Sequence, residues 1–150
     1  APDGRVLLQD VTGRSPAAEL ATFLPIPVSL GGDVTLDLKE LELEGGRLVV
    51  AEGSIAWTQA AFISPLEAAL GDIRVVLKPR DEGGFDARMT DGGGPLRLDG
   101  ELQLEPNGTY RLDALLGTRP GASPALEENL AMVGRRTPKG RYRVVHQGRI

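Results

Sequence analysis

Few residue types in this chain could support catalysis. The chain contains one histidine, His146, and no cysteine. Without cysteine there are no thiol nucleophiles or thiolate metal sites, and a zinc or iron site usually needs several histidine, cysteine or carboxylate ligands. A serine triad would also need His146 as its base, and no Gly-x-Ser-x-Gly motif is present. We therefore predict no catalytic, cofactor-binding or metal-binding residues, and no enzyme activity.

Two pairs of acidic residues have a spacing that could matter chemically, namely Glu42 with Glu44 and Asp99 with Glu101. Side chains two positions apart on a strand lie on the same face, so each pair could serve as acid and base or bind calcium. Charged outer faces of sheets produce such pairs by default, and we interpret them in that way. The glycine-rich residues 92–95 precede a strand rather than a helix, which favours a turn over a phosphate-binding loop.

Length and charge narrow the function classes further. The 150 residues suit a single domain covering residues 1–150. The net charge is −4, and acidic and basic residues are interspersed along the chain. Aromatic residues make up only 4% of the chain, too few for a base-stacking platform. We therefore predict no nucleic-acid partner. One local excess of positive charge is interpreted as a solvated loop and strand face; it comprises Arg135, Arg136, Lys139, Arg141 and Arg143.

Alternating apolar and polar residues, cut by frequent glycine and proline, predict an all-β fold. The sheet is expected to be mainly antiparallel, either curved or sandwiched. In residues 34–44 the alternation changes phase between Leu38 and Leu41, which indicates a bulge or a bend. Residues 96–104 and 110–116 predict a hairpin around Asn107 and Gly108, where an Asn-Gly turn favours positive φ at both central residues.

Two short helices are predicted to interrupt the strands, near residues 16–24 and 124–133. Each begins with a serine followed by a proline, which is typical of a helix N-terminus. In the second helix Leu126, Leu130 and Val133 would share one face, and Gly134 is a candidate C-terminal cap. Residues 142–150 predict a last alternating strand, which becomes a candidate sheet edge because the chain stops there.

An ordered series of short motifs resembles the type II secretion system protein N family. The resemblance covers roughly residues 45–150, fits residues 28–44 loosely and fits the first 27 poorly. The motifs are GSIAW at 53–57, PL at 65–66, LGD at 70–72, GGPLRLDG at 93–100, LQLEPNGTY at 102–110, RP at 119–120, AL at 125–126, LAMVG at 130–134, GRY at 140–142 and GRI at 148–150.

The resemblance implies an accessory, non-catalytic component of the type II secretion system of Gram-negative bacteria. Such a protein would help export folded proteins from the periplasm across the outer membrane. Family members usually begin with a transmembrane anchor, so the resemblance implies a periplasmic domain of an inner-membrane protein whose anchor is absent from this chain. The family more often has an acidic residue where residues 133–140 are basic. Other secretion subunits are the implied partners, and the oligomeric state is left undefined.

Two modes of action remain open at this stage. In the first, the domain binds a partner by strand addition at the edge formed by residues 142–150, through Arg141, Arg143, Val145 and Arg149. In the second, the apolar face of a curved sheet forms a groove for a lipid or another apolar ligand. A filled core with an unpaired edge strand would favour the first mode, and an uncovered apolar groove would favour the second.

Overall fold

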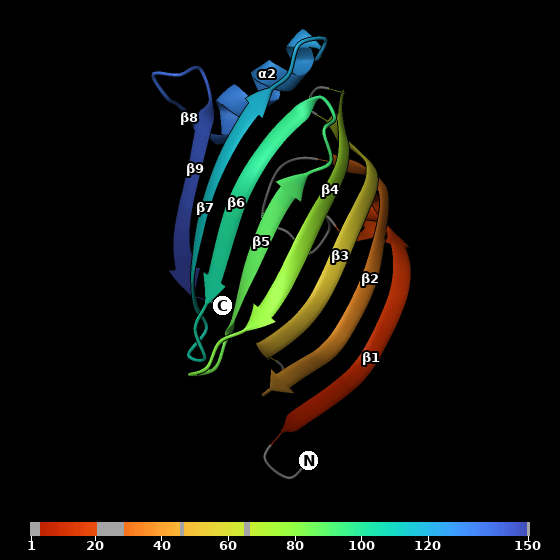
Figure 1. Ribbon diagram of the computed structural model, residues 1–150, viewed down its shortest axis with the longest axis vertical. Helices are drawn as coiled ribbons and strands as arrows, with labels where there is room; N and C mark the ends of the chain where they lie inside the picture. Colours follow the sequence, from red (N-terminus) through yellow and green to blue (C-terminus); the bar gives the residue numbers. More distant parts are fainter. Residues whose placement is uncertain (1–3, 21–28, 46, 65–66, 150) are drawn as a thin grey trace.

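The computed structural model describes residues 4–20, 29–45, 47–64 and 67–149. Within these residues the strands form one curved, antiparallel sheet of nine strands in the order β1-β2-β3-β4-β5-β6-β7-β9-β8 (Figure 1). The prediction of an all-β fold with two helices is confirmed. The sheet is a single curved layer, which settles the choice between a curved sheet and a sandwich.

The strands and helices follow one another along the chain with short connections. Their bounds are β1 Arg5–Pro16, α1 Ala17–Leu20, β2 Ser29–Glu44, β3 Arg47–Ser64, β4 Ala68–Pro79, β5 Phe85–Asp91, β6 Leu96–Leu104, β7 Thr109–Thr118, α2 Pro124–Val133, β8 Arg135–Arg136 and β9 Tyr142–Arg149.

The phase change in β2 is a register shift, as the sequence indicated. The pairing of β2 with β3 shifts between Leu38 and Glu40. Opposite this point Gly53 has a φ of 142°, and a Cβ there would clash with the carbonyl oxygen of Asp37. Because only glycine permits this approach, Leu38 and Leu41 can both pack in the same apolar cluster despite their opposite parity.

Apolar side chains on one face of the sheet form two clusters, and we call this side the apolar face. One cluster lies under α2, where Leu126 and Leu130 are fully buried against β4, β6 and β9. Trp57 packs against this cluster and donates its indole N–H to the Gly31 carbonyl at 2.8 Å. The second cluster includes Leu38, Leu77, Phe85 and Leu104, with flanking residues that extend from β1 to β7. The opposite, polar face carries most of the ion pairs.

The helices agree with the prediction in place but differ in detail. Helix α2 covers the predicted residues 124–133, with Pro124 in its first turn. Val133 is 46% exposed rather than buried beside Leu130. Gly134 has extended backbone and donates its N–H to the Leu130 carbonyl, so it is not a left-handed cap. The first helix begins at Ala17 and is short, and the predicted residues 21–24 lie outside the described residues.

The hairpin between β6 and β7 is present, but its turn is of another type than expected. Gly108 has a φ of 90°, whereas Asn107 is not among the residues with positive φ. The Gly108 N–H donates to the Glu105 carbonyl at 3.0 Å, and the Glu105 N–H donates to the Thr109 carbonyl at 2.8 Å. This is a type I turn followed by a left-handed glycine, because Pro106 fixes a negative φ at the first central position.

We predict that Gly108→Val destabilises the hairpin by roughly 1–2 kcal/mol, because a β-branched residue is strained at positive φ. The matched control is Gly13→Val on β1, where φ is not positive and a Cβ would meet nothing within 4 Å. Chemical denaturation of both variants measures the difference. Equal stability of the two variants would contradict the assignment of strain to Gly108.

Candidate functional site

The acidic pairs singled out from the sequence are each held by an arginine on a neighbouring strand. The Nε of Arg5 lies 2.8 Å from Oε1 of Glu42, and its Nη2 lies 3.5 Å from Oε2 of Glu44. Arg88 lies 3.0 Å from Asp99 and 2.7 Å from Glu101. Because each pair already has a cation between its carboxylates, the pairs act as cross-strand ion pairs of the sheet.

His146 lies on β9 and is committed to a neighbouring aromatic side chain. Its Nδ1 is 2.8 Å from the Tyr110 hydroxyl, and the two rings stack with centroids 5.6 Å apart. Tyr110 also lies over Gly148, where an added Cβ would meet its hydroxyl oxygen at 2.8 Å. Among the residues that the structure describes, no group of three or more His, Cys, Asp or Glu could hold a metal ion.

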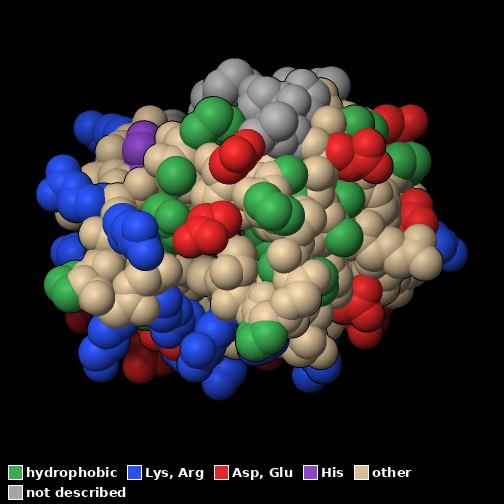
Figure 2. All heavy atoms as spheres, turned by 90° about the horizontal axis from the view of Figure 1, so that it is seen from above, with side chains coloured by type: hydrophobic (Ala, Val, Ile, Leu, Met, Phe, Trp, Pro, Cys, Tyr) green, Lys and Arg blue, Asp and Glu red, His purple; other side chains and the backbone are tan. Residues whose placement is uncertain are grey.

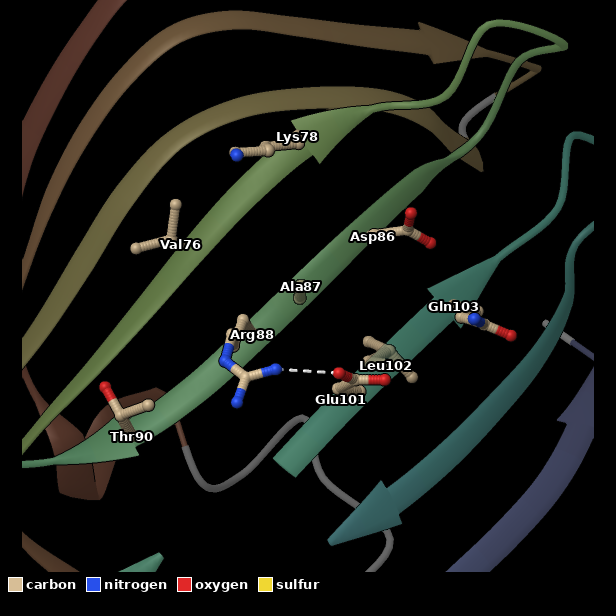
Figure 3. A pocket seen from close by; sticks show the side chains of 9 residues that line it. All are labelled: Val76, Lys78, Asp86, Ala87, Arg88, Thr90, Glu101, Leu102 and Gln103. Atoms are coloured by element: carbon tan, nitrogen blue, oxygen red, sulfur yellow. Dashed lines mark hydrogen bonds and ion pairs between the residues drawn. The ribbon is translucent and has the colours of Figure 1, made fainter. Parts of the chain in front are cut away.

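A hollow of 380 Å³ lies on the polar face over β4, β5 and β6. Figure 3 shows Lys78, Asp86, Arg88 and Glu101 around it, with Arg88 bonded to Glu101. Its charged side chains come from adjacent strands of an exposed sheet surface.

Asp91 is the ionisable group with the strongest perturbation, and its role is structural. It accepts hydrogen bonds from the N–H groups of Gly93 (2.9 Å) and Leu98 (2.8 Å) and from the Arg119 guanidinium (2.6 Å). Burial alone would raise its pKa, but these hydrogen bonds lower the pKa of Asp91 to about 2. Arg119 also donates to the carbonyls of Gly94 and Leu96. The cluster therefore fastens the glycine-rich turn between β5 and β6.

The outer edge of β9 is mostly unpaired. Strand β7 pairs with β9 over residues 142–149 without a register shift, whereas β8 covers only Tyr142 and Arg143 on the other side. The backbone of residues 144–149 therefore has no neighbouring strand on its outer side within the described residues. Such an edge can accept an added strand.

The direction of the free backbone groups follows from the turn that precedes β9. Arg141 directs both backbone groups outward, because its carbonyl accepts from the Thr137 N–H at 2.6 Å and its own N–H donates to the Thr137 hydroxyl at 3.2 Å. In an antiparallel ladder alternate residues point both groups to the same side. Residues of the same parity, Val145, Gln147 and Arg149, therefore present their N–H and C=O groups outward.

A hollow of 760 Å³ adjoins this edge, between β9, β8 and the C-terminal end of α2. It combines exposed apolar side chains, Met132 (59%), Val133 (46%) and Val145 (48%), with the arginines Arg111, Arg135 and Arg143. Figure 2 shows that Lys and Arg side chains gather on the side of the molecule where β8 and β9 lie. The edge is thus bordered by apolar surface and positive charge.

The four residues predicted to bind a partner are distributed around β9. Val145 and Arg143 line the hollow at the edge, and Arg143 also makes a bidentate ion pair with Asp113 at 2.7 and 3.1 Å. Arg141 lies on the polar face over Gly117, with its Nε buried and without a hydrogen-bond partner among the described atoms. Arg149 lies at the far end of β9, where it donates to the Asn107 carbonyl.

Sequence reasoning missed Met132 and Val133 as candidate binding residues. The helical spacing predicts a buried Val133, and nothing in it marks Met132 as exposed beside a strand edge. Arg135 belongs to the basic segment, but its position at the end of the hollow depends on the hairpin between β8 and β9.

Comparisons with known proteins agree on one family. The family model described as type II secretion system (T2SS), protein N, matches residues 1–145. Curated proteins named type II secretion system protein N are similar to the chain: that of Vibrio cholerae is 27% identical over 90% of this chain and 54% of its own length. The proteins of Pectobacterium carotovorum and Aeromonas hydrophila are 23% and 24% identical, over 83% and 99% of this chain.

The chain spans 50% to 60% of the length of these three relatives. No solved structure matches it significantly.

We predict that Asp91→Asn lowers the free energy of unfolding at neutral pH by about 2 kcal/mol, the equivalent of the pKa shift. A carboxylate whose pKa is lowered on folding stabilises the protein above its unfolded pKa. The difference between wild type and Asp91→Asn should therefore shrink as the pH falls from about 4 to about 2. Denaturation at several pH values measures it.

Asp86→Asn is the matched control, since Asp86 is an exposed carboxylate 3.9 Å from Arg80. A loss of stability in Asp86→Asn as large as that in Asp91→Asn would contradict the special role of Asp91.

Proposed function

The chain belongs to the type II secretion system protein N family, and from that premise we propose that it is a non-catalytic accessory component of the system. It contributes to the export of folded proteins from the periplasm across the outer membrane through contacts with other secretion subunits. The domain acts as an assembly component, and it binds other subunits through the edge of its sheet rather than through a polar pocket.

The observation that carries this proposal is the free edge of β9. Val145, Gln147 and Arg149 present outward backbone groups, and the adjoining hollow exposes apolar side chains from α2 and β9. Strand addition would satisfy the backbone groups, and packing in the hollow would bury the apolar side chains. The two contributions together give affinity and a defined register.

In this proposal the domain lies in the periplasm, and the full-length protein is anchored in the inner membrane. No helix in the described part of the chain is long and apolar enough to cross a membrane. The described residues would then form the part that meets other subunits. The proposal requires no cofactor, no metal and no nucleic acid.

The alternative, a groove for a lipid or another apolar ligand, receives less support. The apolar side chains of the sheet pack into two clusters, with α2 laid over one of them. The two hollows described above lie on the polar face and beside the edge of β9. The packing of α2 onto the first cluster and the unpaired edge of β9 support assembly over ligand transport.

We predict that Val145→Pro in the full-length, anchored protein strongly reduces copurification with the secretion apparatus. Proline removes the outward N–H of residue 145 and cannot take part in a ladder there. Val145→Thr is the matched control, because threonine keeps the N–H, the β-branch and nearly the same volume. Thermal unfolding of both variants must first show that the domain remains folded.

Wild-type copurification by a folded Val145→Pro protein would exclude strand addition at β9. The basic residues 135–139 or the helices would then be the next candidates for the contact.

A further inference from the structure

We propose that the free edge of β9 is closed at one end, so that it accepts a short extended segment of a partner protein whose C-terminal end is acidic. This inference rests on the proposed function, because it names the chemistry of the segment that would add to the edge. Strand β8 stops the ladder at one end of β9, and unpaired positive charge lies beside this point.

Strand β8 sets the closed end. Arg135 and Arg136 pair with Arg143 and Tyr142, and the intervening turn is held by the Gly140 N–H donating to the Thr137 carbonyl at 3.0 Å. An added strand can therefore pair only with residues 144–149. At a rise of about 3.3 Å per residue this length is roughly 20 Å, which suits a segment of about six residues.

The direction of the added segment follows from the rest of the sheet. Every neighbouring pair of strands in the sheet is antiparallel, including β8 with β9. Antiparallel pairing is also slightly more stable per residue than parallel pairing. A segment that runs antiparallel to β9 continues the line of β8, so its C-terminal end meets β8.

Positive charge is concentrated at this closed end. Of the three arginines that line the hollow, Arg143 is neutralised by Asp113. Arg111 acts on the same carboxylate, since it helps to lower the pKa of Asp113. Arg135 has no ion-pair partner among the described residues, and it belongs to β8 itself. Residues 129–150 contain no aspartate or glutamate. An acidic side chain or a terminal carboxylate at the end of the segment would complement Arg135.

The apolar side chains at the edge add a second requirement. Met132, Val133 and Val145 are each about half exposed around the hollow. A segment with an apolar side chain in its middle would cover them and gain burial that a wholly polar segment cannot. The occupant is therefore an extended segment of a partner protein with an apolar centre and an acidic C-terminal end.

Two fluorescent peptides of identical composition test this inference. Both carry valine and threonine in the middle; one has two acidic residues at its C-terminal end, and the other has them at its N-terminal end. Binding to the purified chain is followed by fluorescence anisotropy at low and high salt. We expect the C-terminally acidic peptide to bind about fivefold more tightly, and the preference to weaken with salt.

Arg135→Glu should abolish or reverse the preference between the peptides, while Arg136→Glu should retain it. Arg136 undergoes the same change of charge on the same strand, but it does not line the hollow. Equal binding of the two peptides, equal effects of the two variants, or no binding of either peptide to the wild type would overturn the inference.

The outcomes also separate this inference from the proposed function. If the peptides fail to discriminate but Val145→Pro still disrupts copurification of the full-length protein, strand addition stands and the acidic segment is wrong. If Val145→Pro leaves copurification unchanged in a folded protein, the proposed function at β9 fails, whatever the peptides show.

Discussion

The structure depends on how a single sheet buries its own apolar face. A flat layer would leave this face in water, and the one helix of more than four residues among those described cannot cover nine strands. Close backbone contacts allow the sheet to bend and shift register: Gly53 lies against the carbonyl of Asp37, and a Cβ on Gly71 would lie 2.9 Å from the Gly94 Cα. Because these contacts exclude a side chain, they hold the bend in one place. The curved sheet lets α2 lie against both β4 and β9, although three strands separate them within the sheet.

A sheet built in this way has edges, and its two edges are treated differently. At the β9 edge the preceding strand β8 pairs with the first two residues of β9, and arginines lie beside the edge, a common protection against unspecific pairing. The outer edge of β1 instead exposes Val6, Leu7 and Leu8, with Arg5 held by Glu42 and Glu44 on the strand behind it. In the part of the chain that the structure describes, the β9 edge combines free backbone groups with a lined hollow and unpaired positive charge. This combination explains why we assign the contact to β9.

The sequence predicts the strands well because alternation with a period of two directly reflects which face a side chain occupies. Helix α2 is also predicted well, because its signals lie within its own sequence: Pro124 at the start and the spacing of Leu126 and Leu130. The features that escape prediction depend on distant parts of the chain. Pro106 overrides the preference of the Asn-Gly pair in the hairpin turn, and Val133 is exposed at the end of α2 next to the edge of the sheet. Asp91 accepts hydrogen bonds from Leu98, across the turn, and from Arg119 after β7. These residues are far apart in the sequence, so no short motif predicts the contacts.

The arrangement of charge links the fold to recognition. On the polar face, arginines are matched with carboxylates on neighbouring strands, as Arg88 is with Asp99 and Glu101 and Arg143 is with Asp113. Matched charges cancel at a distance and contribute little to the long-range field. The field near β8 therefore comes mainly from Arg135, Arg136 and Lys139, which have no ion-pair partner in the described part of the chain, and the net charge of the whole chain is −4. An acidic segment would be drawn toward this corner and repelled from the remainder of the surface. Electrostatic attraction would thus guide the segment to the β9 edge, where backbone groups are free to hold it.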